Sequence, residues 1–121
     1  MQASFQNFKQ AIAAVLPPNQ QLAGADAGNA FAGPAGHGHG PEILLQPTAL
    51  GDIQAIVRAA HQTSTALTAV SSGAPHHTAL ALPSGPFATI DFSRMQRVIR
   101  IDEASRAVRI EPGVTYAQLV P

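Results

Sequence analysis

The residues with the clearest chemical potential in this sequence lie in one short loop, residues 71–77, which reads SSGAPHH. The loop follows an apolar run, and small residues that leave a strand let backbone N–H groups converge on a phosphate. The same composition is also typical of an ordinary turn between strands. The candidate chemistry is therefore phosphate binding, with a plain turn as the alternative. The candidate binding residues are Ser71, Ser72, Gly73, Ala74, Pro75 and His76.

Histidines offer a second kind of chemistry, metal binding. His37 and His39 lie two residues apart, and His76 and His77 are adjacent. A zinc site needs at least three protein ligands, and neither pair has a carboxylate or a third histidine nearby in the sequence. We therefore interpret these side chains as solvent-exposed loop histidines and predict no metal site. The absence of cysteine also excludes disulfides and thiolate ligands.

Two strands and a helix are expected to position the loop. The apolar run at residues 43–45 is bounded by prolines and predicts a short buried strand over residues 43–46. Residues 48–63 carry an apolar stripe at helical spacing, with Thr48 as the expected cap. Residues 67–71 then form a second strand. This order predicts a βαβ unit with a parallel pair of strands, and it places the loop at the carboxyl end of that pair, where ligands bind in open α/β sheets.

The second half of the chain predicts three further strands. Residues 87–92 form a third strand, in which Asp91 is interpreted as a local cap because aspartate readily bonds neighbouring backbone. Residues 98–102 and 107–111 alternate in polarity on either side of a polar turn, which predicts an antiparallel hairpin. The Glu-Pro-Gly sequence at 111–113 then predicts a turn.

The beginning of the chain predicts two segments of different character. In residues 1–18, Phe5, Phe8 and Ile12 recur at helical spacing, which predicts an amphipathic helix. Residues 19–40 are interpreted as a connector, because residues 24–40 hold six of the ten glycines, interspersed with alanine. Such a composition offers little surface to bury, so we expect the segment to be poorly ordered.

Composition excludes several classes of function. Seven basic and seven acidic residues among 121 give no net charge, whereas nucleic-acid binding normally requires a basic face. The sequence contains no apolar run of the ~18 residues that a membrane span needs and no pattern of a secretory signal. We therefore expect no nucleic-acid partner, no membrane span and a cytoplasmic location.

Five segments follow one another in the order and spacing of a known family. They are PEILLQPT at 41–48, DIQAIV at 52–57, the small-residue loop at 71–77, IDFSRM at 90–95 and EPGVT at 111–115. Together they resemble the FAD-binding domain of the vanillyl-alcohol oxidase and p-cresol methylhydroxylase superfamily, the domain shared with glycolate oxidase flavin subunits and D-lactate dehydrogenases.

This resemblance implies a fold and a site. The fold would be α+β, with residues 41–121 forming an incomplete FAD-binding domain: a first subdomain built on the βαβ unit and the start of a second. The loop would bind the FAD pyrophosphate. In the family this loop has an arginine, two or three glycines, a threonine and a small residue. Here their positions are held by Val70, Ser71, Ser72, Gly73, Ala74 and Pro75.

The resemblance also implies a function. The intact protein would be an FAD-dependent oxidoreductase acting on a small molecule, such as a 2-hydroxy acid or another alcohol. Its partners would be FAD and the remainder of the FAD-binding and cap domains, where the substrate and catalytic residues of the family lie. The alternative, from a different class, is a small α/β module that binds a partner without catalysis.

Overall fold

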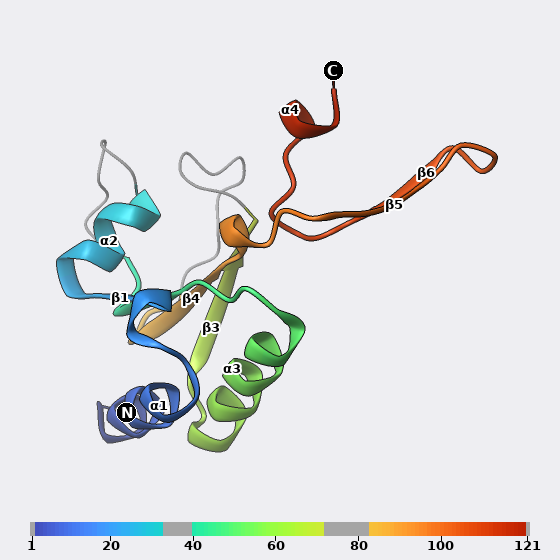
Figure 1. Cartoon of the computed structure of the whole chain (residues 1–121). Helices are drawn as coiled ribbons and strands as arrows, with labels where there is room; N and C mark the ends of the chain where they lie inside the picture. Colours follow the sequence, from blue (N-terminus) through green and yellow to red (C-terminus); the bar gives the residue numbers. More distant parts are fainter. Residues whose placement is uncertain (1, 33–39, 72–82, 121) are drawn as a thin grey trace.

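The computed structural model describes residues 2–32, 40–71 and 83–120 (Figure 1). Its centre is a four-stranded sheet in the order β1-β2-β4-β3. Strands β2 and β3 both pair with β4 in parallel, and β1 pairs with β2 antiparallel. The mixture of helices with a small mixed sheet confirms the α+β prediction. The bounds of the strands are β1 Gln21–Ala23, β2 Ile43–Leu45, β3 Ala66–Val70 and β4 Phe87–Asp91.

The predicted βαβ unit is present, but its two strands are not neighbours. Strands β2 and β3 are parallel, as predicted, and helix α3, Leu50–Thr63, connects them. However, β4 lies between them. The physical reason is burial: all five residues of β4 are buried, whereas β3 has only Val70 buried. A strand that is buried on both faces takes the centre of the sheet, where both of its edges are paired.

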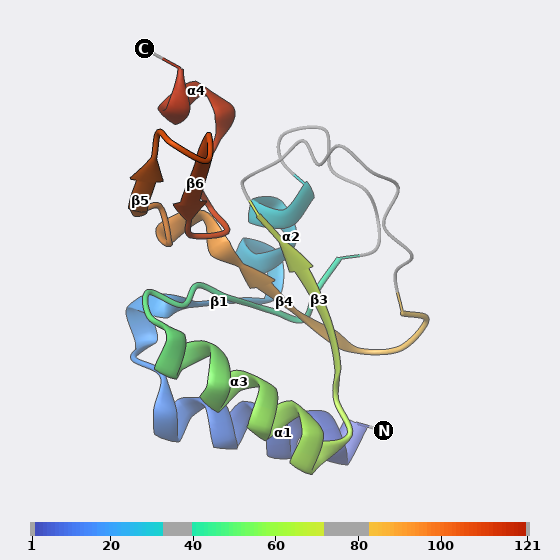
Figure 2. The ribbon, with the colours of Figure 1, turned by 90° about the vertical axis from the view of Figure 1, so that its right-hand side faces the viewer.

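Two helices cover one face of this sheet (Figure 2). Helix α1, Gln2–Val15, packs on α3, and the α1 side chains of Phe5, Phe8 and Ile12 join Ile56 of α3 in one core. The sheet contributes the residues whose side chains point to this face, Ile43, Leu45, Ala88 and Ile90. The predicted N-terminal amphipathic helix is thereby confirmed as a part of the main core.

The opposite face is covered by helix α2, Gly24–Ala32 (Figure 2). The prediction that residues 24–40 are poorly ordered is therefore wrong for residues 24–32, and residues 33–39 lie outside the described residues. Ala27 and Phe31 of α2 are buried against Leu44 and Val70. The physical reason is that four of the nine residues of α2 are alanine, the best helix former.

The cap of α3 lies one residue later than predicted. Ala49 is the N-cap, with extended backbone, and the side chain of Thr48 makes no cap hydrogen bond. Instead the backbone N–H and the hydroxyl of Thr48 both donate to Oδ2 of Asp52, at 3.0 and 3.2 Å. Asp52, in the first turn, therefore accepts a hydrogen bond from the backbone N–H that precedes the helix. The positive end of the helix dipole also favours a carboxylate at this position.

A two-stranded ribbon follows β4 in the chain. Strands β5, Val98–Asp102, and β6, Ala107–Ile110, pair antiparallel, as predicted, and extend away from the four-stranded sheet (Figure 1). A short helix, α4, Tyr116–Leu119, follows, with the backbone N–H of Thr115 donating to the side chain of Gln118 at 2.8 Å. Two single-turn 3-10 helices complete the fold, η1 Pro18–Gln20 and η2 Phe92–Arg94.

The helices are too short or too polar to cross a bilayer. Within residues 2–32, 40–71 and 83–120, no helix combines the length and the apolar character that a membrane span requires.

Candidate cofactor site at the carboxyl edge of the sheet

The three parallel strands end side by side at one edge of the sheet, which we call the carboxyl edge. Val70, the last residue of β3, is the register partner of Asp91, the last residue of β4, and Leu45 at the end of β2 is the partner of Ile90. The residues that follow the outer two strands are Gln46 and Ser71. In open α/β sheets, ligands bind beyond the carboxyl ends of the strands. The topology therefore places the start of the predicted phosphate loop at the position typical of a ligand site.

Of the predicted site residues, the structure places one. Ser71 is exposed directly after β3, next in the chain to the buried Val70. Its hydroxyl can act as a donor to an anion. The other predicted residues, Ser72, Gly73, Ala74, Pro75 and His76, lie outside the described residues.

Asp91 is a buried carboxylate at this edge, with 6% of its surface exposed. Its Oδ1 accepts a hydrogen bond from the backbone N–H of Ser93 at 2.9 Å, which confirms the predicted local cap. Its Oδ2 accepts a hydrogen bond from Nε2 of Gln46 at 3.1 Å. Both carboxylate oxygens are therefore bonded to groups of the fold itself.

Gln20 extends this polar cluster to the start of α3. Its Nε2 donates to the backbone oxygen of Gln46 and to Oδ2 of Asp52, each at 3.0 Å. The backbone N–H of Thr48 is the main cause that lowers the pKa of Asp52, aided by the hydrogen bond from Gln20. Asp52 is therefore ionised at neutral pH. The roles of Gln20 and Gln46 were not predicted from the sequence. For Gln46, the signal in the sequence is its position as a polar residue directly after a buried apolar run.

Two carboxylates lie near the carboxyl edge. Asp52 and Asp91 both accept hydrogen bonds from neutral groups of the fold. Ser71 offers a hydroxyl on the exposed side. The described part of the site is thus compatible with a ligand that needs hydrogen-bond donors, as the composition of the loop predicts.

The predicted turn at 111–113 is confirmed, and its glycine has a packing role. The backbone N–H of Val114 donates to the oxygen of Glu111 at 3.1 Å, and that of Gly113 donates to the oxygen of Met95 at 2.9 Å. A Cβ atom on residue 113 would collide with the carbonyl oxygen of Phe92. Glycine is therefore required here because the turn packs directly on the backbone of η2.

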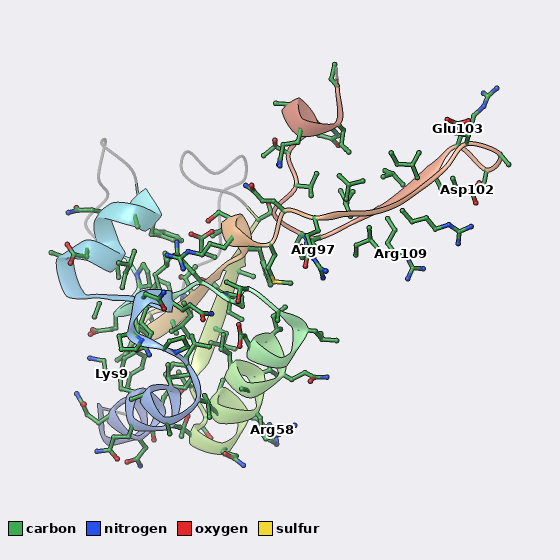
Figure 3. The ribbon with its side chains drawn as sticks, in the orientation of Figure 1. Lys9, Arg58, Arg97, Asp102, Glu103 and Arg109 are labelled. Atoms are coloured by element: carbon green, nitrogen blue, oxygen red, sulfur yellow. The ribbon has the colours of Figure 1, made fainter. Side chains whose placement is uncertain are left out.

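Glu111 joins this turn to the base of the ribbon. Its side chain is only 7% exposed and accepts two hydrogen bonds through Oε1, from the backbone N–H of Arg97 at 2.8 Å and from Nε of Arg97 at 3.1 Å. The guanidinium of Arg97 is the main cause that lowers the pKa of Glu111. In Figure 3 the labelled side chains of Asp102, Glu103 and Arg109, by contrast, lie on the ribbon, away from the four-stranded sheet.

A cavity of about 460 Å³ lies at the opposite, amino edge of the sheet, where Ser64, Thr65 and Pro86 flank the starts of β3 and β4. None of the described residues that line it is charged. Among the residues that the structure places, no group of three histidines, aspartates or glutamates is arranged to bind a metal ion.

Comparison with known proteins gives a family match. A family model described as an FAD binding domain matches residues 41–121 of the 121 residues. This region includes the βαβ unit, the candidate loop, the ribbon and α4. Among curated proteins, the L-gulonolactone oxidase of Mus musculus is 26% identical over 85 residues, which is 70% of this chain and 19% of that enzyme.

Solved structures show the same fold. A structure of p-cresol methylhydroxylase with substrate bound has a TM-score of 0.78 and 22% identity over 98% of this chain. The 4-ethylphenol oxidase from Gulosibacter chungangensis, in complex with isoeugenol, has a TM-score of 0.75 and 22% identity over 97% of the chain. In both cases the chain covers 24% of the larger protein. The chain thus spans about a quarter of these structures and about a fifth of the mouse enzyme.

Proposed function

The chain belongs to the family of FAD binding domains, and from this premise we propose that it is the pyrophosphate-binding part of an FAD-dependent oxidoreductase. The observation that carries the proposal is the position of Ser71: it begins the small-residue loop at the carboxyl ends of three parallel strands, inside the region that the family model matches.

The proposed task of this chain is to hold the cofactor. Ser71, Ser72 and the backbone N–H groups around Gly73 would donate to the pyrophosphate oxygens, while Pro75 has no N–H to contribute. When bound, the flavin supplies the redox chemistry. No described residue is assigned a catalytic role, because substrate and reacting atoms would be oriented by parts of the protein that correspond to the other three quarters of its relatives.

The proposed substrate is a small alcohol, such as a 2-hydroxy acid. Support comes from the names of similar proteins, an L-gulonolactone oxidase and a glucose dehydrogenase, which point to small hydroxylated molecules or their lactones. The proposed partners are FAD and the remainder of the FAD-binding and cap domains. A cytoplasmic location is part of the proposal and rests on the composition and pattern of the sequence alone.

The proposal is tested by FAD binding in the full-length protein. We expect Gly73→Val to weaken FAD binding by a factor of about 100 or more, on the order of 3 kcal/mol, because a branched side chain would prevent close approach of the loop backbone to the phosphates. The measurement is a titration of the apoprotein with FAD, followed by quenching of flavin fluorescence.

The matched control is Gly51→Val. Gly51 lies in the first turn of α3 and is exposed, and a Cβ atom at this position would meet no other atom within 4 Å. We expect this variant to bind FAD as the wild type does. Equal affinities of wild type and Gly73→Val would remove the loop from the site. A full-length protein without any FAD affinity would favour the alternative, a non-catalytic α/β module.

A further inference from the structure

The sheet face beneath α2 changes in polarity along β4. At the amino end, the ring of Phe87 packs against that of Phe31, edge to face, with centroids 6.5 Å apart. Two residues on, the hydroxyl of Thr89 is hydrogen-bonded to that of Thr68 at 2.7 Å. Asp91 follows two residues further along β4, at the carboxyl edge. The face thus runs from aromatic through hydroxyl to carboxylate in the direction of the candidate cofactor site.

Asp91 is costly where it lies. A buried carboxylate loses its hydration, and this loss must be offset by hydrogen bonds or opposite charges. The two groups that donate to its oxygens are neutral, the backbone N–H of Ser93 and the amide of Gln46. A fold that needed only apolar packing at this position would be served as well by a larger apolar side chain. This free-energy cost indicates that Asp91 has a function at the carboxyl edge.

That task is indicated by what Asp91 connects. Its Oδ2 bonds to Gln46, the residue after β2, and its Oδ1 bonds to η2, the element after β4. Its backbone is the register partner of Val70, the last residue of β3. The side chain of Asp91 therefore joins the end of β2 to η2, while its backbone lies beside Val70, which is covalently bonded to Ser71.

We propose that Asp91 and Gln46 form a clamp that positions the phosphate loop for FAD. The inference rests on the proposed function, because it assigns a purpose to the clamp only if the loop after Val70 binds the pyrophosphate. Asp91 is a positioning residue: it acts through the strand ends and does not itself touch the cofactor. Binding geometry that must be held within about 0.5 Å depends on such supporting hydrogen bonds.

The test uses the full-length protein, with the affinity for FAD and the thermal midpoint of the apoprotein measured on each variant. Asp91→Ala removes both hydrogen bonds, and Gln46→Leu removes only the one between the strand ends. We expect each to weaken FAD binding by about tenfold or more. Asp91→Asn keeps an acceptor for Ser93 and can pair with Gln46 once that amide is turned round, so it should keep the affinity within about threefold of wild type.

Thr89→Val is the matched control for stability. It breaks the buried hydrogen bond to Thr68 on the same strand and face but leaves the clamp intact. We expect a lower thermal midpoint and unchanged FAD affinity. If Thr89→Val weakens FAD binding as much as Gln46→Leu does, or if neither clamp variant weakens it, the inference is wrong although the proposed function stands. If the wild type binds no FAD, the proposed function itself fails.

Discussion

The strand at the centre of the four-stranded sheet, β4, and the two strands of the β5–β6 ribbon differ completely in burial. All five residues of β4 are buried, whereas none of the residues of β5 and β6 is. Five of the nine residues of β5 and β6 are valine or isoleucine, the residues typical of strands, whereas β4 has the mixed sequence FATID. The difference teaches that strand formation follows from local sequence, while burial depends on which elements pack against the strand.

The ribbon nevertheless has two distinct faces. A β-bulge between Val98 and Arg100 shifts the register by one residue. As a result Arg100, Asp102 and Arg109 share one face, and Arg100 lies beside Arg109 across the ribbon. The other face holds only β-branched apolar residues. They are Val98, Ile101, Val108 and Ile110.

This apolar face contributes little to the stability of the chain, because hydrophobic stabilisation scales with the apolar area removed from water. Ile101 is 69% exposed and Val108 is 42% exposed, whereas Phe8 in the main core is fully buried. Substitutions in the two regions should therefore differ in their effect on the free energy of unfolding.

The largest effect is expected in the core between α1 and the sheet. Phe8→Ala should lower the free energy of unfolding by about 3–5 kcal/mol, because it removes buried area and leaves a cavity. Urea denaturation followed by circular dichroism measures this change. Val15→Ala on the exposed side of the same helix is the control and should change stability by about 0.5 kcal/mol or less. A loss below about 1 kcal/mol for Phe8→Ala would show that α1 does not belong to the cooperative core.

A smaller effect is expected where the ribbon joins the sheet. Gly113→Ala should destabilise the chain by about 1–3 kcal/mol, since the added Cβ meets the backbone carbonyl of Phe92, which cannot rotate away as a side chain could. Gly51→Ala, at a helical glycine with open space around it, is the control and should be neutral or stabilising. The same urea experiment compares the two. Equal stability of both variants would mean that the turn is not held against η2.

The pH dependence of stability tests both regions together. The pKa of Glu111 at the base of the ribbon and that of Asp52 beside the sheet are both lowered in the fold. Carboxylates with lowered pKa values stabilise the fold fully above their unfolded pKa, and this stabilisation is lost as the pH falls through the folded value. We therefore expect the free energy of unfolding to fall as the pH drops below about 4.

Two variants separate the contributions of the two regions to this loss of stability at acid pH. Glu111→Gln should remove the contribution of the ribbon base, and Asp52→Asn that of the sheet, so each should flatten part of the dependence measured by urea denaturation between about pH 7 and pH 3. A stability that rises toward acid pH would contradict the assigned pKa directions.

The smallest effect is expected on the ribbon itself. Ile101→Ser replaces an apolar side chain that is already mostly in water, so the free energy of unfolding of this chain should change by about 0.5 kcal/mol or less. A loss above about 1 kcal/mol would mean that the apolar face of the ribbon is covered in solution, and sedimentation of the chain would then show whether a second copy covers it.

Most of the strands could be predicted because their signals are local. The run at 43–45 is apolar and bounded by prolines, and residues 98–110 alternate in polarity about a turn. The order of the strands could not be predicted, because it depends on which strands are buried on both faces, as β2 and β4 are. Helix α2 was missed because its sequence mixes glycine, which favours a flexible chain, with alanine, which favours a helix. Phe31 alone also did not show that its side chain would pack in a hydrophobic core.

The site was predictable only in its position. Parallel strands bring their carboxyl ends together, so the exposure of Ser71 at that edge follows from the βαβ order. The bond between Gln46 and Asp91 does not, because 45 residues separate them in sequence and neither residue type signals its partner. Pairings of this kind depend on sheet register, which becomes visible only in three dimensions.

The central place of β4 has a consequence for the order of events during synthesis. A chain leaves the ribosome from its N-terminus, so α1, β2, α3 and β3 are all made before residues 87–91. Until β4 emerges, β2 has a partner only in β1, and β3 has none among the described strands of this sheet. We therefore expect a nascent chain halted before residue 87 to remain open and sensitive to protease, and release of β4 to close the sheet in a single late step.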